Sequence, residues 1–82
     1  MPYYQKKPIP VEARQYTGDN FLELQDWSNG DVEHSMDGDG TLVYSLEGPM
    51  RFNEGDYIIK GVRGEFYPCQ KDIFEETYEK VD

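Results

Sequence analysis

The stretch that decides the fold class is GDYIIKGVRGEFYPC, residues 55–69. Its segment YIIK, residues 57–60, is the most strongly β-prone run in the chain, because tyrosine and isoleucine are enriched in strands. The GVRG segment at residues 61–64 indicates a tight turn, after which residues 65–67 predict a second strand. Pro68 has no amide hydrogen, so it either ends this strand or places it at the edge of a sheet.

The chain before this stretch has the pattern of short strands separated by turns. Strands are predicted at residues 32–36, 41–46 and 50–52. The four-residue loop at residues 37–40 suits a hairpin, and further turns are predicted at residues 47–49 and 53–56. Consecutive strands joined by short turns pair antiparallel, so the sheet is expected to be mainly antiparallel.

The N-terminal third predicts a strand followed by a helix. Residues 11–17 alternate small or apolar with larger polar side chains, which is the period of a half-buried strand. Asn20, with Glu23 three positions later, resembles a capping box at the start of a helix. The Asn-Gly pair at residues 29–30 supplies the left-handed conformations that end a helix. The inward face of this helix is predicted to hold Phe21, Leu24 and either Trp27 or Ser28.

The C-terminal segment predicts a second, shorter helix. The sequence DIFE at residues 72–75 is another capping-box pattern. Phe74 and Tyr78 are four positions apart, so their side chains meet on one helical face. A helix is therefore expected over residues 72–78, and the tail at residues 79–82 is a candidate last strand.

These elements predict one α+β domain over residues 1–82. Because hairpins dominate, the mainly antiparallel sheet is expected to be curled or barrel-like, with a helix near the N-terminal third and a short C-terminal helix. A chain of 82 residues buries only about 60–65% of the surface that its unfolded form exposes, which makes its stability marginal. Association would relieve this, so a homo-oligomer is expected.

The chain is strongly acidic, with a formal net charge of −9. Three bases against one acid give residues 1–18 a charge of +2, which leaves −11 for residues 19–82. This charge repels nucleic-acid phosphates, so direct DNA or RNA binding is not expected. A basic partner would be attracted to the acidic part.

Cysteine usage and hydropathy indicate an intracellular protein. Cys69 is the only cysteine, so no intramolecular disulfide can form, and a small chain without disulfides suggests a reducing compartment. No segment approaches the roughly 20 apolar residues that a membrane span needs. The cytoplasm is the expected compartment, with no membrane association.

Three patterns that could carry chemistry are interpreted as structural. His34 and Cys69 lack any sign of an oxyanion site, so they are expected to be a solvent-facing strand residue and a small buried apolar residue. The DGDG turn at residues 37–40 has too few acids for a calcium loop. The GVRG turn at residues 61–64 lacks the phosphate-loop form and precedes a strand. The chain is therefore predicted not to be an enzyme and to hold no cofactor or metal.

Four cationic and aromatic side chains are the candidate ligand-binding residues: Arg14, Tyr16, Arg63 and Tyr67. Arg14 and Tyr16 are expected on the outward face of the first strand. Arg63 is expected at the tip of a turn near Tyr67, where a guanidinium and a ring could hold an anion and stack a flat group. Together they predict a shallow pocket for a small anionic ligand; the alternative is that they are solvated side chains.

Several segments resemble a family of small proteins of tailed bacteriophages and prophages. They are PVEARQYTGDN at residues 10–20, GDYIIKGVRGEFYPC at residues 55–69, and DIF and TYE at residues 72–74 and 77–79. The likeness covers both ends of the chain but not residues 30–50. The resemblance implies a non-virion accessory protein in the cytoplasm of the infected bacterial host, of a kind that often counters host defence.

The resemblance leaves two modes of action open. The first is a sponge, an oligomer that sequesters a nucleotide-derived signal at the four candidate residues without cleaving it. The second is an acidic inhibitor that imitates DNA and blocks a basic host protein, such as a nuclease, a CRISPR effector or a transcription component, through the acids Glu75, Glu76 and Glu79. Acids are spread through residues 19–82 rather than spaced as a row, which favours the sponge.

Overall fold

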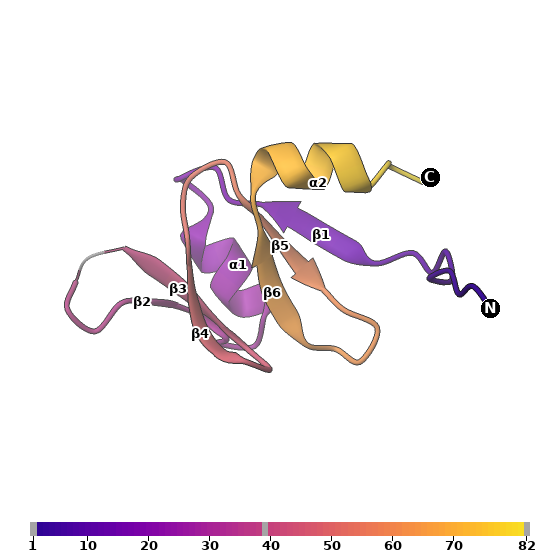
Figure 1. The fold of residues 1–82 in the computed structure, drawn as a ribbon. Helices are drawn as coiled ribbons and strands as arrows, with labels where there is room; N and C mark the ends of the chain where they lie inside the picture. Colours follow the sequence, from indigo (N-terminus) through magenta and orange to yellow (C-terminus); the bar gives the residue numbers. More distant parts are fainter. Residues whose placement is uncertain (1, 39, 82) are drawn as a thin grey trace.

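The computed structural model describes residues 2–38 and 40–81, and in this part of the chain it has six strands and two helices (Figure 1). The elements in chain order are β1 (Glu12–Gln15), α1 (Phe21–Trp27), β2 (Val32–His34), β3 (Thr41–Ser45), β4 (Gly48–Phe52), β5 (Tyr57–Lys60), β6 (Phe66–Cys69) and α2 (Lys71–Thr77). The fold is α+β, and its helices lie in the N-terminal third and at the C-terminus, as the sequence predicted.

The first sheet has the strand order β1-β5-β6, with both pairings antiparallel. Arg14 lies opposite Ile58, and Ile58 lies opposite Pro68, so these three share one face of the sheet. The neighbouring row, which points to the other face, is Ala13, Ile59 and Tyr67. Pro68 therefore occupies the edge strand β6, which is one of the two placements that its missing amide hydrogen allowed.

The second sheet is an antiparallel meander with the order β2-β3-β4. Its β3–β4 hairpin turns at Leu46 and Glu47, so β4 begins earlier than the strand predicted at residues 50–52. The loop between β2 and β3 forms the predicted hairpin, although Asp39 within it lies outside the described residues.

The prediction of one curled or barrel-like sheet is wrong, because the strands divide into two separate three-stranded sheets. The chain crosses from one sheet to the other at the turn 53–56, where Asn53 N–H donates to Asp56 Oδ2 over 2.8 Å. The crossing is tied to the end of β1 by two backbone bonds, from Gly55 N–H to Tyr16 O and from Tyr16 N–H to Asp56 O, at 2.7 and 2.8 Å. β5 therefore pairs with the distant β1 instead of the adjacent β4.

The main core lies between the two sheets and α1. Its buried members are Leu24, Val32, Val43, Phe52, Ile58 and Phe66, with Tyr16, Phe21 and Trp27 packed against them. Ser28 is also fully buried, and its hydroxyl donates to Gln25 O and accepts from Val32 N–H. Trp27 and Ser28, the two alternatives predicted for the inward face of the helix, thus both face the core. The chain then leaves α1 through residues 29 and 30, whose φ angles are 56° and 89° as the Asn-Gly pair predicted.

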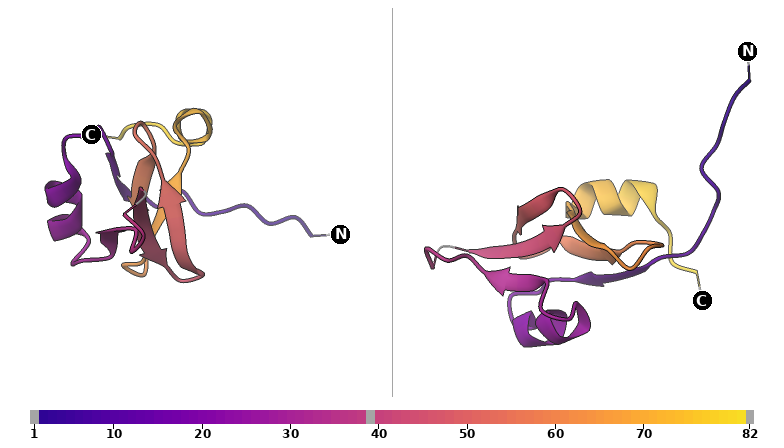
Figure 2. Two further views of the ribbon diagram at one scale, coloured as in Figure 1. Left: turned by 90° about the vertical axis from the view of Figure 1, so that its left-hand side faces the viewer. Right: turned by 90° about the horizontal axis from the view of Figure 1, so that it is seen from below.

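The C-terminal helix covers the opposite face of the first sheet. The ring of Phe74 stacks on Tyr57 at 3.8 Å between centroids and on Tyr78 at 4.9 Å. Beneath this face Ile59 is fully buried. Figure 2 shows α1 and α2 on different sides of the sheets. Since α2 has no fully buried residue, these aromatic contacts hold it in place.

Both capping-box predictions and the last strand need correction. Neither helix has a side-chain hydrogen bond at its N-cap. The side-chain amide of Asn20 bonds backbone groups of the preceding loop, at Gln15 and Thr17. Asp72 lies inside the first turn of α2, where its carboxylate accepts from the backbone amide of Ile73. Residues 79–81 form no strand and line a hollow beside α2; residue 82 lies outside the described residues.

Candidate functional site

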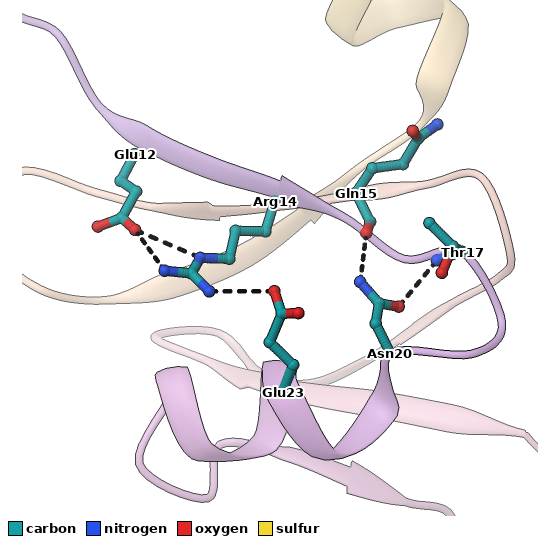
Figure 3. A network of polar contacts seen from close by, with 6 residues as sticks. All are labelled: Glu12, Arg14, Gln15, Thr17, Asn20 and Glu23. Carbon is teal, nitrogen blue, oxygen red and sulfur yellow. Dashed lines mark hydrogen bonds and ion pairs between the residues drawn. The ribbon is translucent and has the colours of Figure 1, made fainter.

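Arg14 faces α1 rather than solvent, so its predicted outward position is wrong. Its guanidinium bonds Glu12 on β1 at 3.2 Å and Glu23 on α1 at 3.1 Å (Figure 3). The same group lies 4.9 Å from the centre of the Trp27 ring. Its charge is shared between two carboxylates, and 37% of its side chain is exposed. Arg14 is thus a strand-to-helix clamp with little positive charge left for an external anion.

Tyr16 also lies on the inner side of the molecule. Its ring packs edge-on against Phe52 at 5.2 Å between centroids, at the margin of the core. The outward position predicted for Tyr16 is therefore wrong. Alternation along β1 correctly put Arg14 and Tyr16 on one face, but it could not show that α1 and the second sheet cover that face.

The structure does not bring the four predicted residues together in one pocket. The register puts Tyr67 on the face of the first sheet opposite to Arg14. Arg63 is exposed in the β5–β6 turn, as predicted, where its backbone N–H donates to Glu65 Oε1 over 2.9 Å. Arg63 and Tyr67 thus belong to one hairpin, while Arg14 and Tyr16 belong to the covered face.

Tyr67 is half-buried beside α2 and has a strongly perturbed phenol. Burial raises its pKa to about 12, helped by a hydrogen bond with Tyr78 and by the charge of Glu65. A phenol with this pKa stays neutral and acts as a hydrogen-bonding group at physiological pH. It is therefore unsuited to act as a base.

A hollow of about 360 Å³ opens where β6 approaches the β3–β4 hairpin. Its lining is Ser45, Leu46, Glu47, Met50, Glu65, Phe66, Tyr67 and Pro68. Glu47 comes from the β3–β4 turn and Glu65 directly precedes β6, so the lining holds two acids and no base; the Glu65 carboxylate also accepts from Arg63 N–H in the adjacent turn. We call this the acid-rimmed hollow. A lining of apolar side chains and two carboxylates suits a ligand with both apolar and cationic groups.

A second hollow of about 320 Å³ lies between α2 with its tail and the first sheet. It is lined by Val11, Ala13, Tyr57, Phe74, Tyr78, Glu79, Lys80 and Val81. One acid and one base stand in its lining, so it has no charge preference of its own. It is mainly the seam along which α2 packs on the sheet.

The remaining titratable candidates do not form a site. His34 is exposed on β2 and stacks on Phe21 at 3.9 Å between ring centroids. Cys69 is half-buried on β6, and burial raises the pKa of its thiol, with Asp56 and Asp72 adding to the effect. No group of three metal-ligating side chains occurs within residues 2–38 and 40–81. A raised thiol pKa is opposite to what a nucleophilic cysteine needs.

Of the residues that line the acid-rimmed hollow, sequence reasoning singled out only Tyr67 as part of a site. Glu47 and Glu65 are 18 positions apart and lie on different sheets, so only the packing of β6 against the second sheet brings them to one opening. The sequence carried no signal for Leu46, which was predicted within the strand at residues 41–46. The structure places it in the β3–β4 turn, where it is 74% exposed.

Comparisons with known proteins found no counterpart. None of the protein-family models, curated proteins or solved structures compared with the chain matches it. Among the described residues, neither helix has the length and apolar character to cross a membrane.

Proposed function

We propose that this chain is a non-catalytic bacteriophage accessory protein that binds a basic segment of a bacterial host protein in the acid-rimmed hollow. The observation that carries the proposal is the hollow itself, whose lining combines apolar side chains with two acids and no base, in a chain of net charge −9. The phage origin rests on the sequence resemblance. Host proteins that act on nucleic acid are rich in basic segments, which makes them suitable partners.

The chemistry of the hollow favours a segment with lysine or arginine next to apolar side chains. Leu46 and Met50 are 74% and 38% exposed, so each offers apolar surface that a partner could cover. Tyr67 adds a ring with a neutral phenol. The two glutamates at the rim attract a cation and would speed its encounter with the hollow.

A test begins by finding what occupies the hollow. A photo-crosslinking amino acid replaces Leu46 at the hollow, and in a control protein it replaces Glu76 on the exposed side of α2. Crosslinking in infected bacteria is expected to join one host protein, through a basic segment, to position 46 and not to position 76.

The affinity of the purified partner then decides whether the rim acids matter. Glu47→Gln with Glu65→Gln is compared with Glu75→Gln and Glu76→Gln, which changes the net charge by the same amount. Binding is expected to weaken about tenfold or more in the first pair alone, and to weaken with rising salt. Equal losses in both pairs would show that net charge, not the hollow, drives binding.

A second candidate function, sequestration of a small nucleotide-derived anion, is favoured by the β5–β6 hairpin. Lys60 and Arg63 are both exposed there, and Lys60 Nζ lies 6.0 Å from the ring centre of Phe66. The hairpin thus offers two exposed cations, of which Lys60 lies opposite Glu12 of the Arg14 clamp and Arg63 lies in the turn beyond it. In an oligomer, the hairpins of two copies could combine into one anion site.

Native mass spectrometry separates this candidate from the first. The protein is incubated with a small-molecule extract of infected, defence-proficient bacteria. A discrete added mass that is released unchanged on denaturation, and is lost in Arg63→Glu but kept in Arg51→Glu, would support sequestration. If no mass is added, the sponge reading is abandoned for the protein-binding one.

A further inference from the structure

The N-terminal segment, residues 2–10, stands outside the folded body. Every residue in it is exposed, with Tyr3 and Tyr4 at 96% and 94%. Figure 2 shows it running away from the sheets. The radius of gyration of 13.8 Å exceeds the roughly 12 Å of a compact chain of this length, which agrees with a projecting segment. We call it the arm.

The composition of the arm is opposite to that of the body. The arm, PYYQKKPIP, carries two lysines and no acid, whereas residues 19–82 carry a charge of −11. Two tyrosines and Ile9 supply apolar surface on either side of the lysines. Three prolines restrict the backbone to extended conformations, which lowers the entropy lost when the arm is bound.

The acid-rimmed hollow has the complementary features. Its lining contains two glutamates and no base, and Leu46 and Met50 in the same lining offer exposed apolar surface. Aromatic and apolar grooves with nearby acids are a recurrent way to bind extended, proline-containing basic segments. Of the two hollows, only this one has an excess of acids in its lining.

We propose that the arm of one copy docks in the acid-rimmed hollow of a second copy. The proposal rests on the proposed function, because it assigns the same hollow to a basic segment with apolar side chains. The arm leaves from β1 and the hollow adjoins β6, which are opposite edges of the first sheet. The arm also points away from its own body, so we expect it to dock in the hollow of a neighbouring copy and not in its own.

If two copies exchange arms, they form a closed dimer. Each copy donates one arm and accepts one, so the two contacts are related by a twofold axis and no free arm remains. A basic segment of another protein would have to displace the arm to reach the hollow. The dimer would then be a resting state that limits binding to partners of sufficient affinity.

Sedimentation analysis of the full chain and two charge variants tests the exchange. The full chain is expected to dimerise, and Lys6→Glu with Lys7→Glu to associate at least about tenfold more weakly. Adding Glu47→Lys and Glu65→Lys to that variant in the same chain restores the charge match and is expected to restore the dimer. Because Glu65 holds the Arg63 turn, Glu47→Lys alone serves as a second, less disruptive swap.

A chain lacking residues 2–10 completes the test. It is expected to be monomeric and to bind a synthetic peptide of residues 2–11, with the binding lost when Glu47 and Glu65 are changed to Gln. A monomeric full chain, or a dimer that survives removal of the arm, overturns the proposal. The same truncated protein keeps its hollow, so retention of the host partner by it would leave the proposed function standing while the arm exchange fails.

Discussion

Tyr67 on β6 and Tyr78, which directly follows α2, are near enough for Tyr78 to be one of the causes that raise the pKa of the Tyr67 phenol. This proximity brings the edge strand β6 next to the C-terminal end of α2. Because Tyr67 also lines the acid-rimmed hollow, the packing of α2 and the shape of the candidate site are mechanically linked.

The raised pKa of the Tyr67 phenol, caused mainly by burial, predicts a loss of stability at alkaline pH. The pKa of Tyr67 rises from 10.0 to about 12 on folding, so the folded state holds the phenolic proton more tightly. The contribution of this group is fully present below pH 10.0 and is lost as the pH rises toward about 12. Urea unfolding at a series of pH values should show a steeper alkaline decline in the free energy of unfolding for the natural chain than for Tyr67→Phe. Tyr44→Phe on the exposed side of β3 is the control, and the same decline in both variants would contradict the assignment.

The Arg14 clamp predicts a modest effect on stability. Replacing Arg14 with Gln removes two ion pairs and the contact with the Trp27 ring. Exposed ion pairs and cation–π contacts are each small, so we expect a loss of about 1 kcal/mol in the free energy of unfolding. Arg63→Gln, at an exposed turn, should change it by less than about 0.5 kcal/mol. Equal effects of the two substitutions would mean that the clamp contributes nothing.

The Asn20 side chain predicts a larger effect than its exposed loop suggests. Its amide donates to Gln15 O and accepts from Thr17 N–H, both over 2.9 Å, and so joins the end of β1 to the start of α1. Asn20→Ala should lower the free energy of unfolding by about 1–2 kcal/mol. Asn20→Asp keeps the acceptor for Thr17 but loses the donor to Gln15, so its loss should be intermediate. An aspartate as stable as the natural residue would indicate ordinary N-capping instead.

The aromatic stack under α2 predicts local rather than global unfolding. Phe74 lies between Tyr57 and Tyr78, whereas the main core is on the other side of the sheet. Phe74→Ala should therefore speed hydrogen exchange at the amides of residues 74 and 78 and leave core amides such as that of Val43 protected. Ile73→Ala, at a side chain that is 49% exposed, is the matched control. Equal acceleration throughout the chain would show that α2 is part of the cooperative core.

Local pattern was enough to place most elements. The run at residues 57–60 is a strand with the predicted bounds, and the Asn-Gly pair at residues 29–30 ends α1 as expected. Such features depend on side-chain shape and on backbone conformations of a few neighbouring residues, which the sequence states directly. The strongly acidic body and the basic N-terminal segment are likewise properties of the sequence alone.

The division into two sheets and the composition of the candidate site were decided by tertiary structure. β5 could have paired with β4 as a hairpin, and only the tertiary structure shows that it pairs with β1, next to the bonds between Tyr16 and the 53–56 turn. The side of a sheet that becomes inner depends on which helix covers it, so Arg14 and Tyr67 could not be assigned to opposite environments in advance. Glu47 and Glu65 line one hollow because strands distant in sequence pack together. Backbone hydrogen bonds are alike for every residue, so the local sequence does not show which strands will pair.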